Sequence, residues 1–297
     1  MSARRKSAVS PKPPRARAAH PKRSRFAGWD AEAAAGAAGP AAPDWSDLRA
    51  PSGWLLALES RAPLEYLALM AALPWMRQLP QGDGHPVMIF PGLGANDTST
   101  APLRALLDSL GYHTHPWGQG FNFGPRTGVL ERCEHDLRRL RQRFGRKPSL
   151  VGWSLGGLYA RELAKACPDE VRSVVTLGTP FAGHPRATHA WRFFELVSGQ
   201  NSHDPALLDQ LRQPPPVPTT SIYSRSDGIV AWHCSVNEPG PLVENIEVHA
   251  SHIGLGFNPM ALYALADRLA QAEGHWQPFK PHGARKWFYR TPSSAAD

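Results

Sequence analysis

Short apolar runs alternate along the chain with segments in which apolar residues recur every three or four positions. The run Pro86 to Phe90 (PVMIF) predicts a buried strand, and further strands are predicted at 149–151, 171–177, 219–224 and 246–249. Helical patterns cover about 99–111, 129–144, 155–166 and 258–274. Because this alternation is typical of parallel sheets, we expect an α/β fold with a mainly parallel central sheet and helices on both faces.

The two ends of the chain lack this alternation. Residues 1–50 are expected to form a disordered basic arm and linker, residues 51–275 the folded domain, and residues 276–297 a basic tail that leaves the domain. Nine Lys and Arg residues precede the first acidic residue, Asp30. The whole chain has 33 Lys plus Arg and 25 Asp plus Glu, so the rest carries 33 − 9 = 24 bases against 25 acids. The net charge of +8 therefore belongs to the arm.

This charge distribution limits the classes of binding partner that we expect. A nearly neutral body predicts no specific nucleic-acid partner, while the arm offers a peripheral contact with an anionic surface. The oligomeric state stays open. Three cysteines without a CxxC pair favour a reducing compartment and predict no metal site.

No targeting or membrane-spanning segment is recognised. The first 25 residues lack an apolar core, and four prolines there disfavour the amphipathic helix of a transit peptide, so we expect a cytoplasmic protein. The most apolar stretch, Trp54 to Trp75, is interrupted by Glu59, Arg61 and Glu65, which predicts a peripheral helix pair rather than a membrane span.

The most informative motif is Gly-Trp-Ser-Leu-Gly-Gly at 152–157, which lies between a predicted strand and a predicted helix. In such a turn the glycines relieve crowding, and the serine hydroxyl projects from the carboxyl edge of the sheet. The pattern predicts Ser154 as a nucleophile. A glycine-rich strand-to-helix turn without chemistry is the alternative.

A serine nucleophile needs a base and an acid, expected in the order acid, then histidine. Asp227 follows the strand at 219–224 and is favoured over Asp204 and Asp209, which no strand precedes. His252 lies in the loop after the strand at 246–249 and is favoured over His249, the last residue of that strand pattern. The alternative for Asp227 is an ordinary turn aspartate beside a glycine.

An oxyanion hole requires two backbone amides. Leu155 directly follows the nucleophile and is expected to supply one. Leu93, in the Pro-Gly-Leu-Gly loop after the first strand, is expected to supply the other. An ordinary glycine-rich turn is the alternative for that loop.

With these motifs in place, residues 84–274 resemble the α/β-hydrolase superfamily, and within it the lipase-like and carboxylesterase-like members. The resemblance rests on PGLG, GWSLGG, LGTPFAG at 177–183, SDGIV at 226–230 and SHIGLG at 251–256. It implies a Ser154–Asp227–His252 triad, an acyl-enzyme, no cofactor and a cap over an acyl pocket. Many lipases carry His-Gly where this chain has Pro91-Gly92, so the loop that holds Leu93 departs from the family's pattern.

The helical cap is expected at about residues 181–215, a connection longer than the fold needs. Its apolar residues predict walls for an acyl site, with Phe194 and Leu208 as substrate-binding residues together with Trp153 beside the nucleophile. A pair of ordinary packing helices is the alternative.

The leading prediction is a serine esterase or lipase that acts on a small-molecule or lipid ester. An acyltransferase shares the same acyl-enzyme and differs only in its acceptor. A non-catalytic, hydrolase-like binding module with a basic arm is the alternative from another class.

Overall fold

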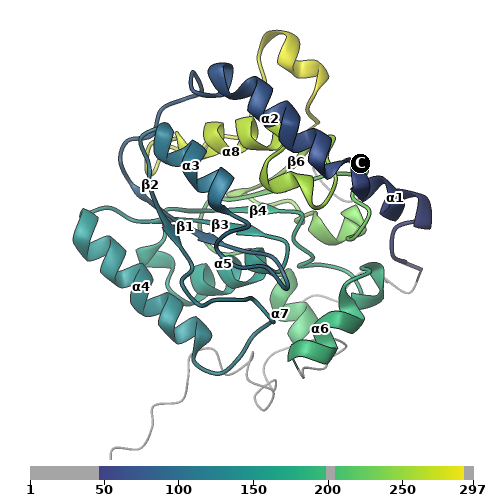
Figure 1. Ribbon diagram of the computed structural model, residues 1–297. Coiled ribbons are helices and arrows are strands. Elements are labelled where there is room, and N and C mark those ends of the chain that lie inside the picture. The colour runs from purple at the N-terminus through teal and green to yellow at the C-terminus, as the bar shows by residue number, and fades with distance from the viewer. Residues whose placement is uncertain (1–46, 199–204, 291–297) are drawn as a thin grey trace, which may run out of the picture.

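A computed structural model describes residues 47–198 and 205–290 of this chain. Residues 1–46 of the arm and linker expected at 1–50, the last seven residues of the expected tail and Asp204 lie outside these described residues. In the described part, six strands form one sheet in which every pairing is parallel, in the order β2-β1-β3-β4-β5-β6 (Figure 1). The strands are β1 (Pro86–Phe90), β2 (His113–Pro116), β3 (Ser149–Trp153), β4 (Ser173–Leu177), β5 (Thr219–Tyr223) and β6 (Val243–Glu247). The predicted parallel α/β sheet is confirmed.

The strand that the sequence analysis missed lies at the edge of the sheet. β2 reads His-Thr-His-Pro and is exposed or half-buried throughout, whereas β1, β3 and β5 are buried at every position. An edge strand with an open face needs no apolar run, so apolar patterning cannot reveal it. Its two histidines pack against Phe144, with ring centroids 4.7 and 5.6 Å away.

Helices cover both faces of the sheet. On one face lie α2 (Ala62–Met76), α3 (Ala101–Ser109) and α8 (Pro259–Leu269), which share one buried apolar cluster with the strands. On the other face lie α4 (Val129–Phe144) and α5 (Leu155–Ala166), which belong to a second cluster (Figure 1). α8 begins where predicted, because the Asn258 side chain accepts hydrogen bonds from the amides of Met260 and Ala261.

Two helices occupy the expected cap, α6 (Trp191–Ser198) and α7 (Pro205–Arg212), between β4 and β5. A fully buried arginine joins α7 to the body. The guanidinium of Arg161 on α5 donates to the carbonyl oxygens of Arg212 and Gln213, at 3.1 and 3.0 Å, and lies 3.8 Å from the ring centre of Phe181. A cation at the carboxyl end of a helix satisfies its unpaired carbonyl groups. α7 is therefore anchored on the helix that follows Ser154.

The segment before β1 forms α1 (Gly53–Ala57), the 3₁₀ turn η1 (Leu58–Arg61) and α2. It was predicted as a peripheral helix pair, and its outer side chains are exposed, with Trp54 at 72% and Trp75 at 68%. No helix of the described residues combines the length and hydropathy that a membrane span requires.

The C-terminal segment differs from the expected tail. Residues 276–290 lie along the body, ending in the turn η6 (Gly283–Trp287) and a bridge between Arg290 and Glu247 at the edge strand β6. Phe279 and Tyr289 are buried, and the Tyr289 hydroxyl donates to the Met260 carbonyl oxygen at 2.9 Å. Two buried aromatic residues, Phe279 and Tyr289, hold this segment on the body. The basic, Pro-containing composition of the segment gives no indication of this packing.

Candidate functional site

The strand-to-helix turn after β3 holds Ser154 in a strained conformation. Ser154 is the one non-glycine residue of the described chain with a positive φ, at +52°. Such a backbone costs about 1–3 kcal/mol and persists only where the surroundings enforce it. Here the Ser154 amide donates to Leu177 and its carbonyl oxygen accepts from Gly157 and the Thr179 hydroxyl, at 2.8 to 2.9 Å.

The flanking glycines are dictated by backbone packing. A Cβ atom on Gly152 would collide with the Gly157 backbone, and one on Gly156 would collide with the carbonyl group of Phe90. The turn therefore tolerates no side chain at either position, which accounts for the Gly-x-Ser-x-Gly spacing around Ser154.

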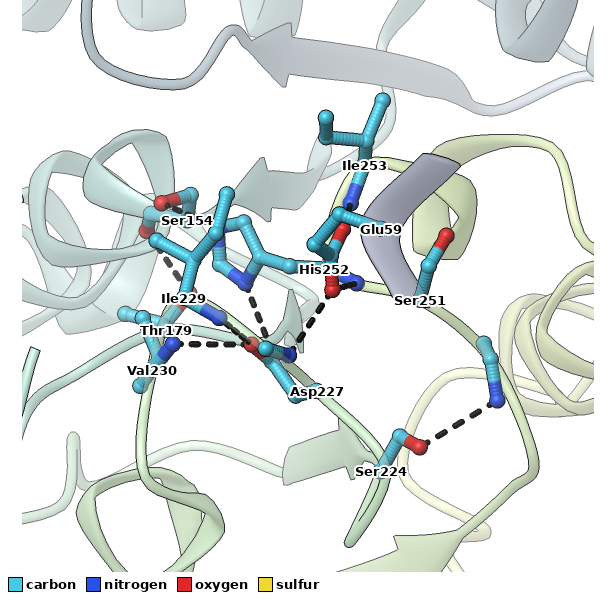
Figure 2. Close-up of polar contacts among 12 residues, drawn as sticks. Glu59, Ser154, Thr179, Ser224, Asp227, Ile229, Val230, Ser251, His252 and Ile253 are labelled. Atoms are coloured by element: carbon cyan, nitrogen blue, oxygen red, sulfur yellow. Dashed lines mark hydrogen bonds and ion pairs between the residues drawn. The ribbon is translucent and has the colours of Figure 1, made fainter. Parts of the chain in front are cut away.

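Three predicted side chains meet at this turn (Figure 2). The His252 Nε2 atom lies 2.9 Å from the Ser154 hydroxyl oxygen, and its Nδ1 atom lies 2.6 Å from Oδ2 of Asp227. The other carboxylate oxygen of Asp227 accepts from the amides of Ile229 and Val230, at 2.9 and 2.8 Å. These two backbone amides fix the orientation of the Asp227 carboxylate independently of its contact with the imidazole. The arrangement suits proton transfer from Ser154 to His252.

The charges around His252 favour its protonated form. Burial alone opposes protonation, but the Asp227 carboxylate, its hydrogen bond and the negative charge of Glu59 outweigh burial, so the pKa of His252 is raised above its ordinary value. A buried imidazole that is stabilised as a cation is suited to hold a proton taken from a nucleophile.

An apolar cavity of about 110 Å³ opens beside Ser154. The cap contributes Phe194 and Leu208 to its lining, together with Trp191, Leu207 and Leu211; substrate binding by Phe194 and Leu208 remains a prediction. Among the described residues that line it there is no Asp, Glu, Lys or Arg. Such a cavity favours an uncharged, apolar ligand group.

Both candidate amide donors lie at this cavity. Leu155 begins α5, and Leu93 follows β1 in a loop whose Gly92 lies against the Ser154 side chain. Asn122 holds that loop, because its side-chain amide donates to the Pro91 carbonyl oxygen at 2.8 Å. The amides of Leu93 and Leu155 as an oxyanion hole remain a prediction.

Trp153, predicted to bind substrate, lies elsewhere. It is the last residue of β3, and it is buried in the cluster shared with α8 rather than in the cavity lining. Successive residues of a strand face opposite sides of the sheet, so Trp153 and Leu150 belong to different clusters. Its indole N–H donates to the His252 carbonyl oxygen at 3.1 Å, which makes it a support for the histidine loop instead.

The segment before β1 also contributes to this site, which the sequence patterns do not predict. The Glu59 carboxylate accepts hydrogen bonds from the backbone amides of Gly228, His252 and Ile253 (Figure 2). Glu65 accepts from the Ser251 amide at 2.8 Å. The sequence does hold one indication of these contacts, because Glu59 and Glu65 are acidic residues inside an otherwise apolar run. By themselves they indicate only that the run does not span a membrane.

The remaining candidates stay apart from this site. His249 is exposed near the start of the loop after β6, and Asp209 on α7 pairs with Arg212 at 2.8 Å. In the described part of the chain, no three His, Cys, Asp or Glu side chains are grouped so as to hold a metal ion.

This chain is similar to known proteins over the region that contains Ser154, Asp227 and His252. A sequence profile described as the alpha/beta hydrolase family matches residues 87–288. The pimeloyl-[acyl-carrier protein] methyl ester esterase of Aliivibrio salmonicida is 30% identical over 115 residues, which cover 38% of this chain and 42% of that protein. The chain thus matches less than half the length of this curated relative.

Two solved structures are also similar. Lipase B of Aspergillus fumigatus has a TM-score of 0.47 and 18% identity, covering 64% of this chain and 53% of that one. A monoacylglycerol lipase of Paleococcus ferrophilus has a TM-score of 0.47 and 17% identity, covering 64% and 96%.

Proposed function

The chain belongs to the alpha/beta hydrolase family, and we propose that it is a serine hydrolase that cleaves carboxylic esters with an uncharged, apolar acyl group. One observation carries this proposal. The Ser154 hydroxyl is hydrogen-bonded to His252 and lines an apolar cavity that has no Asp, Glu, Lys or Arg in its described lining.

The proposed reaction runs through an acyl-enzyme. The Ser154 oxygen attacks the acyl carbon while His252 Nε2 takes its proton, and Asp227 orients and charge-balances the imidazolium. The amides of Leu155 and Leu93 stabilise the negative oxygen of the tetrahedral intermediate. His252 then gives its proton to the departing alkoxide. Water attacks the acyl-enzyme in the same way and releases the acid.

The comparisons support an ester as substrate only as a class. The bacterial relative is named a methyl ester esterase, and both solved structures are named lipases. The choice of an apolar acyl group rests on the cavity of this chain, where Phe194 and Leu208 form part of the wall.

A fluorophosphonate probe tests the proposal, because it reacts covalently with activated serines. We expect the wild-type protein to be labelled and to hydrolyse aryl esters, and the Ser154→Ala variant to do neither. Absence of labelling at Ser154 would reject the hydrolase in favour of a binding module. Preferential transfer to an added alcohol would instead identify an acyltransferase.

A further inference from the structure

The segment of α1, η1 and the start of α2 packs closely on the loops that carry Asp227 and His252. A Cβ atom on Gly228 would collide with the backbone of Leu55, and one on Gly254 would collide with the Glu65 carboxylate. Both glycines belong to the loops after β5 and β6. They are the points where a segment far earlier in the chain, at Leu55 and Glu65, closely approaches these loops.

At the centre of this contact lies Glu59, which is only 6% exposed. One carboxylate oxygen accepts from the amides of Gly228 and His252, at 2.8 and 2.9 Å. The other accepts from the Ile253 amide at 3.0 Å. Figure 2 shows this carboxylate between the Asp227 loop and the His252 loop. Glu59 thus joins the residue after Asp227 to His252 itself.

We propose that Glu59 is a positioning residue that holds the Asp227 and His252 loops at the separation the reaction needs. The inference rests on the proposed function of Ser154, Asp227 and His252. A buried carboxylate that accepts three amide hydrogen bonds is strongly bound to both loops, because charged acceptors make the stronger bonds and an unpaired buried amide is costly. Without it, the loops are joined by the Asp227–His252 pair and by hydrogen bonds of Ala250 with Ser224 and Ser226, none of which involves the backbone of His252.

The charge of Glu59 also acts on the imidazole. Together with the larger effect of Asp227, it raises the pKa of His252 against the effect of burial. Other titratable groups around these two loops are Arg61, which donates to the Ser226 carbonyl, Glu65, which accepts from the Ser251 amide, and the buried Cys234 thiol near Asp227. The loops themselves carry Arg225, which pairs with Glu247 at 3.0 Å, and the exposed His249. The acids that raise the pKa of His252 are Asp227 and, to a smaller extent, Glu59.

Glu65 offers a matched control. Like Glu59, it is an acidic residue of the same segment that joins the histidine loop to the body, through the Ser251 amide at 2.8 Å and the Asn258 side chain at 3.0 Å. It makes no direct hydrogen bond to His252 or to the Asp227 loop, and it reaches that loop only through Arg61, which pairs with Glu65 at 3.1 Å and donates to Ser226. Glu59→Gln and Glu65→Gln therefore remove comparable carboxylates, but only the first removes a carboxylate that binds the amides of Gly228 and His252 directly.

The experiment measures kcat and KM for an aryl ester across pH in the wild type and both variants. For Glu59→Gln we expect kcat to fall by about 10- to 100-fold, since small misplacements of catalytic groups have effects of this size, with KM within about twofold. The acidic limb of its kcat/KM profile moves to lower pH, because the imidazole loses a neighbouring negative charge. Glu65→Gln keeps the wild-type midpoint.

An NMR titration of the His252 imidazole makes the test independent of turnover. A lower His252 pKa in Glu59→Gln, and an unchanged one in Glu65→Gln, supports the inference even for a chain that hydrolyses no ester. Wild-type kcat and an unshifted His252 titration in a folded Glu59→Gln protein would overturn it. Equal shifts in both variants would overturn it as well. Failure of Ser154 labelling in the wild type defeats only the proposed function.

Discussion

Two sets of hydrogen-bonded Asp, His and Ser side chains lie at opposite ends of the same strand, β3. At its carboxyl end, His252 joins Asp227 and Ser154 at 2.6 and 2.9 Å. At its amino end, His85 joins Asp83 and Ser149 at the same two distances. Interatomic distances alone therefore do not distinguish a candidate catalytic group from a structural one.

The serines differ in what surrounds them. Ser149 is fully buried in a regular strand, and its hydroxyl makes a second hydrogen bond to the Ser173 hydroxyl at 3.0 Å. Ser154 follows the strand in a strained turn, lines a cavity and precedes the amino end of α5. Only Ser154 is placed to meet a substrate, because parallel strands open into clefts at their carboxyl ends.

The histidines differ in their charge balance. Burial, helped by Arg172 and Arg146, lowers the pKa of His85 to about 4 in spite of Asp83. The Asp83 carboxylate is shared with Arg172, which donates to it at 2.8 Å. His252 has no such cation acting on it, and its pKa is raised. One histidine is held neutral, and the other is prepared to accept a proton.

Replacing each serine gives the largest expected contrast. Ser154→Ala removes the proposed nucleophile and is expected to lower kcat/KM for an aryl ester by on the order of 10⁴-fold or more. Ser149→Ala is expected to stay within a few-fold of the wild type and to lower the melting temperature instead. Steady-state kinetics and thermal unfolding measure the pair. Similar kinetic losses in both variants would mean that the two ends of β3 are not distinct.

The free energy of unfolding should decrease as pH falls, because the folded protein keeps His85 unprotonated. A histidine with a lowered folded pKa binds fewer protons in the native than in the unfolded state, so stability is lost as pH falls below 6.5 toward 4, by about 3 kcal/mol for His85. His252 acts in the opposite sense. Its raised pKa adds stability that is complete below its unfolded pKa and is lost as pH rises through the folded pKa.

Urea unfolding at pH 7 and pH 4.5 measures this effect in the wild type and in His85→Gln. The variant should lose less of its unfolding free energy between the two pH values, while its ester hydrolysis at pH 7 stays close to that of the wild type. Identical pH dependence in both proteins would show that His85 is not the group that titrates.

The cap side chains give the smallest expected effect. Phe194→Ser and Leu208→Ser remove part of the cavity wall, and we expect turnover of long-chain aryl esters to fall by about 10-fold, with short-chain esters changed by less than about twofold. Leu196→Ser is the control, because Leu196 on α6 is 81% exposed and is not part of the cavity lining. Equal losses for short and long chains would contradict a role in binding the acyl group.

Local patterns predicted the elements that carry the site. The helix expected at 155–166 is α5 with the same bounds, and the glycine spacing around Ser154 marks a turn that side chains would block. The order of strands and loops also led to Asp227 and His252, because the carboxyl ends of neighbouring parallel strands meet at one edge of the sheet. Their chemical roles remain proposals.

The errors arose where contacts come from distant parts of the chain. Trp153 was assigned to the substrate site from its position beside Ser154, but the alternation along β3 turns it toward α8. The C-terminal segment was expected to leave the body, yet Phe279 and Tyr289 anchor it. The alternation along β3 fixes which face of the sheet Trp153 occupies, but the helix that covers that face comes from a distant part of the chain. The contacts that bury Phe279 and Tyr289 likewise come from distant elements.

The sequence by itself determined the alternation of strands and helices, the strained turn at Ser154 and the order of the candidate triad, because these depend on residues close to one another along the chain. Only the tertiary structure decided that Ser154 is open while Ser149 is buried, and that Glu59 reaches His252 across 193 residues. Burial and charge balance depend on what packs against a residue. That neighbour is set by the folded chain rather than by local sequence.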